Sequence, residues 1–157
     1  MYKIGDKVVY PMHGAGIIDH VEEREILGEF HEYFVLNVAP GDMKVMIPVD
    51  KCEEIGIRHI ISKKDVAGVL DVLKGPSTEM SDNWNRRNRE NMEHLKTGDI
   101  LEVAGVVRNL LRVEKAKPLS TGEKKMLTNA RQILESELAL VTGDAEDAVA
   151  ALVEATV

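Results

Sequence analysis

The first third of the chain alternates apolar and polar positions with a period of two, which is the pattern of half-buried β-strands. Short runs of this kind, separated by turn residues, cover residues 7–10, 16–22, 32–38 and 43–48. Pro40 and Gly41 occupy the central positions of the segment 39–42, which favours a type II turn joining the last two runs as a hairpin. Four or five short strands in so short a segment predict a small β-barrel.

Beyond residue 57 the apolar positions recur at the three- and four-residue spacing of amphipathic helices. Side chains that suit helix N-caps precede most of the predicted helices: Ser62, Asp82 or Asn83, Ser120 and Asp144. The segment Thr97–Gly98–Asp99 starts the remaining one. Ser120 also forms a capping box with Glu123, ahead of the clearest amphipathic helix, which ends at Gly143. The second half is therefore predicted to be all-helical, and the whole chain to have an α+β fold.

Length and composition allow two small domains. The chain has 157 residues, 44% of them hydrophobic, enough for one sizeable core or two small ones. The change of periodicity divides it into a β-barrel domain, residues 1–60, and a helical domain, residues 61–157. No apolar run approaches the roughly 18 residues of a membrane helix, and the first residues lack a signal-peptide profile. We expect a cytoplasmic protein that makes no membrane contact.

Charge is distributed unevenly, and this narrows the class of partner. The formal net charge is −7, made up of −6 over residues 1–83, +5 over residues 84–131 and −6 over residues 132–157. An acidic protein does not adhere indiscriminately to DNA, because its summed field repels phosphate. The basic middle third can still grip DNA if a protein partner delivers it there.

The basic third opens with the stretch 81–89, which holds the only tryptophan, Trp84, followed by Arg86, Arg87 and Arg89. A large aromatic plate beside cations suits a contact in which the ring presses on unstacked bases and the charges hold phosphates. Two alternatives remain open on the pattern alone. Trp84 lines up at helical spacing with Leu95 and could belong to the core, and an arginine run is often only a solvated face.

No residue pattern nominates an enzyme. The five histidines are scattered without metal-ligand spacing, and no nucleophile, base or cofactor loop stands out, so we expect no catalytic residues, metal or cofactor. Cys52 has no partner in the chain and predicts a small buried thiol rather than a disulfide or zinc site. Met43 and Met46 fall on opposite faces of their strand, so one of them can be an exposed, adaptable docking surface.

Four segments, taken in order, resemble the CarD/CdnL family of bacterial transcription regulators. They are GDKVVYPMHGAG at residues 5–16, GDMKVMIP at 41–48, NWNRR at 83–87 and LSTGEKKML at 119–127. The similarity runs from about residue 2 to residue 141. Four ordered motifs over most of a short chain are far more specific than any one of them.

The resemblance implies a Tudor-like or SH3-like N-terminal barrel, akin to the polymerase-binding module of the transcription–repair coupling factor, that docks on the RNA polymerase β subunit. Arg24 matches a family position that contacts polymerase. Met46 stands where some members carry a second basic residue for that contact, which implies a more apolar docking surface here.

The resemblance also implies that the helical domain reaches promoter DNA. By that likeness Trp84 enters the minor groove at the upstream edge of the melted region and holds the open complex open. Arg86, Arg87 and Arg89 are then expected on the neighbouring backbone, with Lys124, at the start of its helix, a further phosphate contact. We expect a monomer. The alternative is an adaptor that joins polymerase or a repair factor to a third protein without touching DNA.

Overall fold

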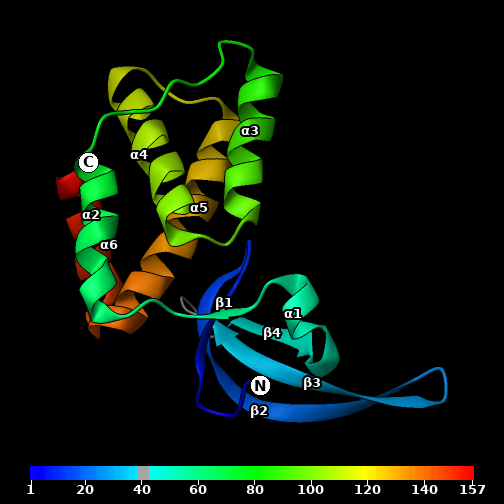
Figure 1. Ribbon diagram of the computed structural model, residues 1–157. Coiled ribbons are helices and arrows are strands. Elements are labelled where there is room, and N and C mark those ends of the chain that lie inside the picture. The colour runs from blue at the N-terminus through cyan, green and yellow to red at the C-terminus, as the bar shows by residue number, and fades with distance from the viewer. Residues whose placement is uncertain (39–42) are drawn as a thin grey trace.

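The computed structural model describes residues 1–38 and 43–157, and its N-terminal part is an antiparallel sheet (Figure 1). In the described residues the sheet has five strands in the order β4-β3-β2-β1-β5. Their bounds are β1 Lys7–Tyr10, β2 Gly14–Ile26, β3 Glu29–Val38, β4 Met43–Pro48 and β5 Arg58–His59. A short helical segment, η1 (Val49–Lys51) and α1 (Cys52–Ile55), links β4 to β5.

Period-two alternation places one face of this sheet in a small core. Val8, Leu36, Val38 and Ile47 are fully or almost fully buried there, and the rest of the core is Ile18, Phe34, Cys52 and Ile57. The predicted pairing of the last two strands is confirmed, since β3 and β4 form an antiparallel ladder. The type II turn predicted for residues 39–42 lies outside the described residues.

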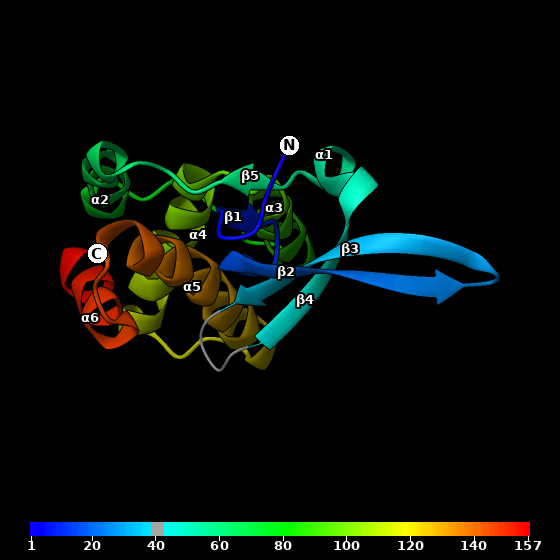
Figure 2. The ribbon, with the colours of Figure 1, turned by 90° about the horizontal axis from the view of Figure 1, so that it is seen from below.

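The β2–β3 hairpin is longer than the sequence pattern indicated. Its ladder continues to the pair Ile26 and Glu29, and Figure 2 shows it projecting well beyond the other elements. Leu27 and Gly28 form its two-residue turn, with φ of 53° and 82°. Positive φ at both positions is the signature of a type I′ turn, whose twist matches that of the strands. We call residues 22–33 the hairpin arm.

The second half of the chain is helical, as predicted, and most helices begin at the predicted caps. They are η2 Lys63–Asp65, α2 Val66–Lys74, α3 Trp84–Lys96, α4 Ile100–Ala116, α5 Thr121–Thr142 and α6 Glu146–Thr156. Ser62 and Asp65 form a capping box, and the side chains of Asn83, Asp99 and Ser120 accept from backbone N–H groups of the following turn. The cap predicted at Asp144 is wrong, because Ala145 occupies that position and α6 starts without a side-chain cap.

The helices pack around their own apolar core. Leu73, Leu95, Leu110 and Leu134 are fully buried, one each from α2, α3, α4 and α5. The last helix adds Val149 and Val153 to this core, so the acidic C-terminal segment is an ordered part of the bundle. Together with the sheet, this confirms the α+β fold. Within residues 1–38 and 43–157, no helix combines the length and the apolar character that crossing a membrane requires.

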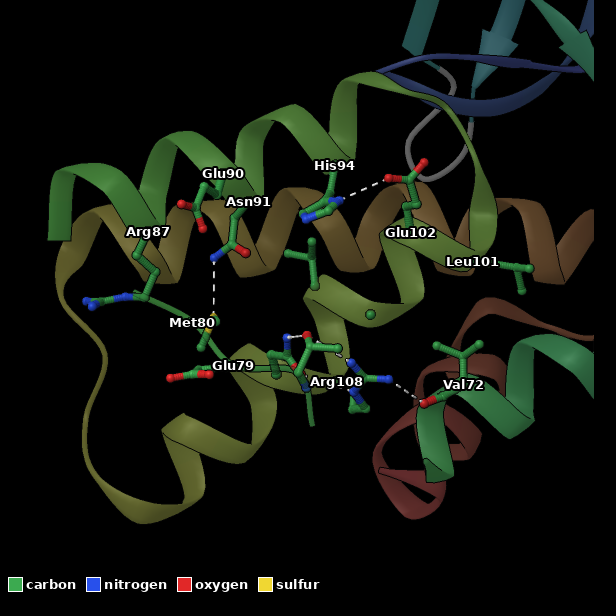
Figure 3. A pocket seen from close by; sticks show the side chains of 14 residues that line it. Val72, Glu79, Met80, Arg87, Glu90, Asn91, His94, Leu101, Glu102 and Arg108 are labelled. Atoms are coloured by element: carbon green, nitrogen blue, oxygen red, sulfur yellow. Dashed lines mark hydrogen bonds and ion pairs between the residues drawn. The ribbon is translucent and has the colours of Figure 1, made fainter. Parts of the chain in front are cut away.

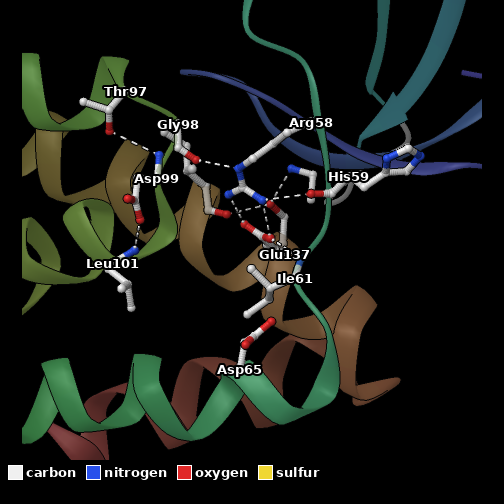
Figure 4. A network of polar contacts seen from close by, with 12 residues as sticks. Arg58, His59, Ile61, Asp65, Thr97, Gly98, Asp99, Leu101 and Glu137 are labelled. Carbon is white, nitrogen blue, oxygen red and sulfur yellow. Dashed lines mark hydrogen bonds and ion pairs between the residues drawn. The ribbon is translucent and has the colours of Figure 1, made fainter. Parts of the chain in front are cut away.

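Helix α5 also joins the bundle to the sheet. The Ala15 N–H donates to the Ser136 hydroxyl at 2.9 Å, and the Arg58 guanidinium donates two hydrogen bonds to the Glu137 carboxylate at 2.8 and 2.7 Å (Figure 4). The same carboxylate accepts from the Ile61 N–H at 2.9 Å. Polar bonds therefore hold the C-terminal half of α5 to β2, β5 and the strand-to-helix connection.

Candidate nucleic-acid interface

Trp84 is the first residue of α3, at the end of the bundle that points away from the sheet (Figure 1). Its side chain is 44% exposed, and its indole N–H donates to the Ser120 hydroxyl at 3.3 Å. The face of α3 that enters the core carries Asn91 and Leu95 instead. The indole is therefore not sealed in the core, and half of it faces solvent.

Two helix N-termini lie side by side at this end. Trp84 meets Ser120 and Arg87 meets Glu123, so α3 and α5 start next to each other and run in the same direction. The first turn of a helix presents free N–H groups and a partial positive charge, which favours anions such as phosphate. Both helices thus bring that favourable end to the surface beside the indole.

Three of the predicted cationic contacts are exposed on the two helices that start here: Arg86 and Arg89 on α3, and Lys124 on α5. Arg86 pairs with Glu90 one turn along α3 at 2.8 Å, an exposed pair of the kind that contributes little to stability. In the described part of the chain, Arg89 and Lys124 form no ion pair. Arg89 and Lys124 are therefore available to a polyanion, whereas Arg86 would have to share its charge with Glu90 or leave that exposed pair.

Arg87 is placed differently from its neighbours. Its Nε donates to Glu123 Oε2 at 2.9 Å and its Nη2 to Oε1 at 3.2 Å, while Nη1 donates to the Ser81 carbonyl at 2.9 Å. The hydrogen bonds to Glu123 raise the pKa of the Arg87 guanidinium above its ordinary value. In this structure the Arg87 guanidinium is therefore bonded to other groups of the protein. Its partner Glu123 lies 36 residues further along the chain, so the local sequence pattern could not reveal the bond.

A pocket of about 250 Å³ lies beneath this region, between α2, α3 and α4 (Figure 3). Arg108 is buried beside it, and its guanidinium donates to the Val72 carbonyl at 3.0 Å and to the Thr78 hydroxyl at 3.3 Å. Burial, with Arg112 nearby, lowers the pKa of Arg108. These bonds close the C-terminus of α2 and anchor the connection that leads to Trp84, so we assign the cluster a structural role.

The polymerase contacts implied by the resemblance lie on one face of the sheet. Arg24 pairs with His31 across the hairpin, Met46 pairs with Val35, and residues 31 and 35 of β3 point to the same side. Arg24 is exposed and bonds to Glu22 at 3.1 Å, whereas Met46 is half-buried.

The hairpin arm beyond Arg24 exposes an unusual amount of apolar surface. Ile26, Leu27 and Phe30 are all exposed, and Leu27 is fully so, at 100%. An isolated exposed apolar side chain is ordinary, but several at the tip of one projecting hairpin mark an interaction surface. The period-two pattern does not reveal these residues, because the arm is exposed on both faces and so lacks alternation of apolar and polar positions.

Other polar groups show ordinary pairings. His20 lies between Asp19 and Glu22, and hydrogen bonds to these two carboxylates raise its pKa. Burial raises the pKa of the Cys52 thiol, which donates to the Pro48 carbonyl. Among the described residues, no group of three or more His, Cys, Asp or Glu side chains is placed to hold a metal ion.

Comparison with known proteins assigns both halves of the chain to one family. Residues 2–61 match the family described as CarD-like/TRCF RID domain, and residues 68–154 match that described as CarD, C-terminal domain. The chain is also 40% identical over 146 residues to a Bacillus subtilis (strain 168) protein named "Putative transcription factor YdeB", an alignment covering 93% of this chain and 95% of that protein. The chain therefore belongs to the CarD family of transcription factors.

Proposed function

We propose that this transcription factor docks on the β subunit of RNA polymerase through its N-terminal sheet and stabilises the promoter open complex with Trp84. The indole enters the minor groove at the upstream edge of the bubble, and Arg86, Arg89 and Lys124 bind the neighbouring phosphates. The observation that carries the proposal is the half-exposed indole at the end of the bundle, beside two helix N-termini, on helices that also carry exposed Arg86, Arg89 and Lys124.

The docking half of the proposal is supported by the hairpin arm. Leu27 combines full exposure with a positive φ, a conformation that a branched side chain adopts only at an energetic cost. A glycine or asparagine there would suit the turn better. An exposed leucine held in this costly conformation supports a role for its side chain in binding, and we assign that role to contact between the arm and a protein partner.

The energies involved are sufficient for regulation. Stacking one aromatic ring on an opened base step contributes about 1–3 kcal/mol. Since about 1.4 kcal/mol is a tenfold change in an equilibrium, that contribution shifts the open population by roughly ten- to a hundredfold. Docking supplies the remainder, because a tethered domain meets its DNA site at an effective concentration of about 1 mM.

The test is the lifetime of the open complex formed by purified polymerase on a fixed promoter. Trp84→Ala should leave polymerase binding unchanged and shorten the lifetime about tenfold, while Trp84→Phe, which keeps an aromatic plate, should retain a measurable part of it. Equal lifetimes for Trp84→Ala and the unaltered protein would refute the proposal that the indole acts as a wedge holding the DNA strands apart. Intact polymerase binding together with no crosslink from Trp84 to DNA would favour the adaptor.

A further inference from the structure

The Trp84 ring lies against the first turn of α5. A Cβ atom built on Gly122 would stand 3.1 Å from Cζ2 of the indole, closer than side chains normally approach. The ring edge therefore occupies the space that any side chain at residue 122 would need. The hydroxyl of Ser120, which caps α5, accepts a hydrogen bond from the indole N–H. We call Ser120, Gly122 and Glu123 the indole seat.

Glu123 fixes the seat relative to α3. Its side chain is only 9% exposed, and both carboxylate oxygens accept from Arg87, whose side chain is 20% exposed. A bidentate guanidinium–carboxylate pair defines the orientation of its two partners more strictly than a single hydrogen bond does. The pair stands one turn beyond Trp84 on α3 and one residue beyond Gly122 on α5, so it sets the spacing of the two helix ends that enclose the ring.

We propose that the indole seat and Arg87 set the pose of Trp84, and that Arg87 acts as a positioning residue through Glu123 rather than as a phosphate contact. This inference rests on the function proposed above. Arg87, expected to contact DNA, becomes a residue that positions the indole. Gly122, which has no functional group, joins the residues that determine activity.

The absence of a side chain at residue 122 has a specific physical reason here. Glycine is a poor helix former, and alanine at the same place would favour α5. Gly122→Ala should therefore leave the fold as stable as before or more stable, while forcing the ring to move. Because Gly122→Ala should stabilise the helix while displacing the indole, any loss of activity in this variant can be ascribed to the position of the ring and not to unfolding.

The first experiment compares Gly122→Ala and Gly122→Leu with Gly68→Ala, a matched control in α2 where an added Cβ meets nothing within 4 Å. Because Trp84 is the only tryptophan, acrylamide quenching of its fluorescence reports on this ring alone. Quenching should rise in the order unaltered protein, Gly122→Ala, Gly122→Leu, with thermal unfolding at or above the original temperature. Gly68→Ala should leave quenching unchanged.

In the promoter assay the same series should shorten the open-complex lifetime by about threefold for Gly122→Ala and about tenfold for Gly122→Leu. Unchanged quenching in both Gly122 variants would overturn the seat. Changed quenching with unchanged lifetimes would show that the pose is not used, and would also overturn it. If Trp84→Ala itself leaves the lifetime unaltered, the proposed function fails, yet quenching still decides whether the seat holds the ring.

The second experiment separates the two roles of Arg87. Arg87→Lys keeps the cation but loses the two-pronged bond, and Glu123→Gln keeps the shape but loses the charge. If Arg87 acts through Glu123, each variant raises quenching and shortens the lifetime, and the double variant goes little further. If Arg87 instead binds phosphate, Glu123→Gln frees it and DNA affinity rises, which would overturn the positioning role.

Discussion

The junction between sheet and bundle offers the most direct test of how the molecule is held together. The Glu137 side chain is only 1% exposed and depends on Arg58 for two of its hydrogen bonds, the third coming from the Ile61 N–H (Figure 4). Arg58 also donates from Nε to the Gly98 carbonyl at 2.9 Å. Replacing Arg58 by methionine removes the cation, keeps most of the side-chain volume and leaves the buried carboxylate with the Ile61 N–H as its one hydrogen-bond donor among the described residues.

The expected loss of stability follows from that burial. Removing one partner of a buried ion pair lowers the free energy of unfolding by about 3–5 kcal/mol, because the remaining charge is left uncompensated. Since the Arg58 side chain is 30% exposed, water can reach the vacated space, and we expect the lower end, about 3 kcal/mol. With a urea dependence of about 2 kcal/mol per molar, the unfolding midpoint should fall by about 1.5 M.

The assay is urea unfolding followed by circular dichroism, with two companion variants. Arg86→Met makes the same chemical change in the exposed pair with Glu90 and should cost at most about 0.5 kcal/mol. Combining Arg58→Met with Glu137→Leu replaces both charges with apolar groups and should restore most of the loss. If Arg58→Met lowers the midpoint no more than Arg86→Met does, the buried pair does not hold the junction.

Two further predictions concern the proposed contacts. Leu27→Asn creates the Asn-Gly sequence preferred by type I′ turns, so the free energy of unfolding should rise by about 1 kcal/mol. Binding to the β subunit, measured by titration, should weaken. Undiminished binding would show that the arm is not part of the docking surface. Arg86→Glu combined with Arg89→Glu should reduce the salt dependence of DNA association by about two phosphate contacts, and an unchanged salt slope would show that neither residue binds the backbone.

The sequence predicted the start of most helices because an N-cap is a local device. Ser62, Asn83 and Ser120 each bond to a backbone group within three residues, so spacing alone reveals them. Asp144 has a side chain suited to an N-cap, but it lies one residue before the actual cap position, Ala145. The local sequence pattern does not locate a helix end to a single residue. The division into residues 1–60 and 61–157 stays a prediction.

Contacts between distant residues were beyond the reach of the sequence pattern. The partner of Arg87 lies 36 residues away and that of Arg58 lies 79 residues away. Neither arginine differs locally from an arginine on a solvated face, and three-dimensional packing alone decides its role. The exposure of Trp84 was therefore within reach of the sequence, the bond from Arg87 to Glu123 was not, and the roles of the site residues stay a prediction.

Helix α5 connects the two proposed contacts in a single rigid element. Its first turn carries the indole seat, and Ser136 and Glu137 hold the sheet about 22 Å further along, at 1.5 Å per residue. Linking two binding sites raises the effective concentration of the second only if both can be occupied at once. With a rigid link such as α5, this holds only when the two partners are separated by the length of the link. In the proposed complex, a docked sheet would therefore present the indole at a fixed place on the promoter. On that proposal, the place where the DNA is held open follows from this spacing, because phosphate contacts position a protein without reading sequence.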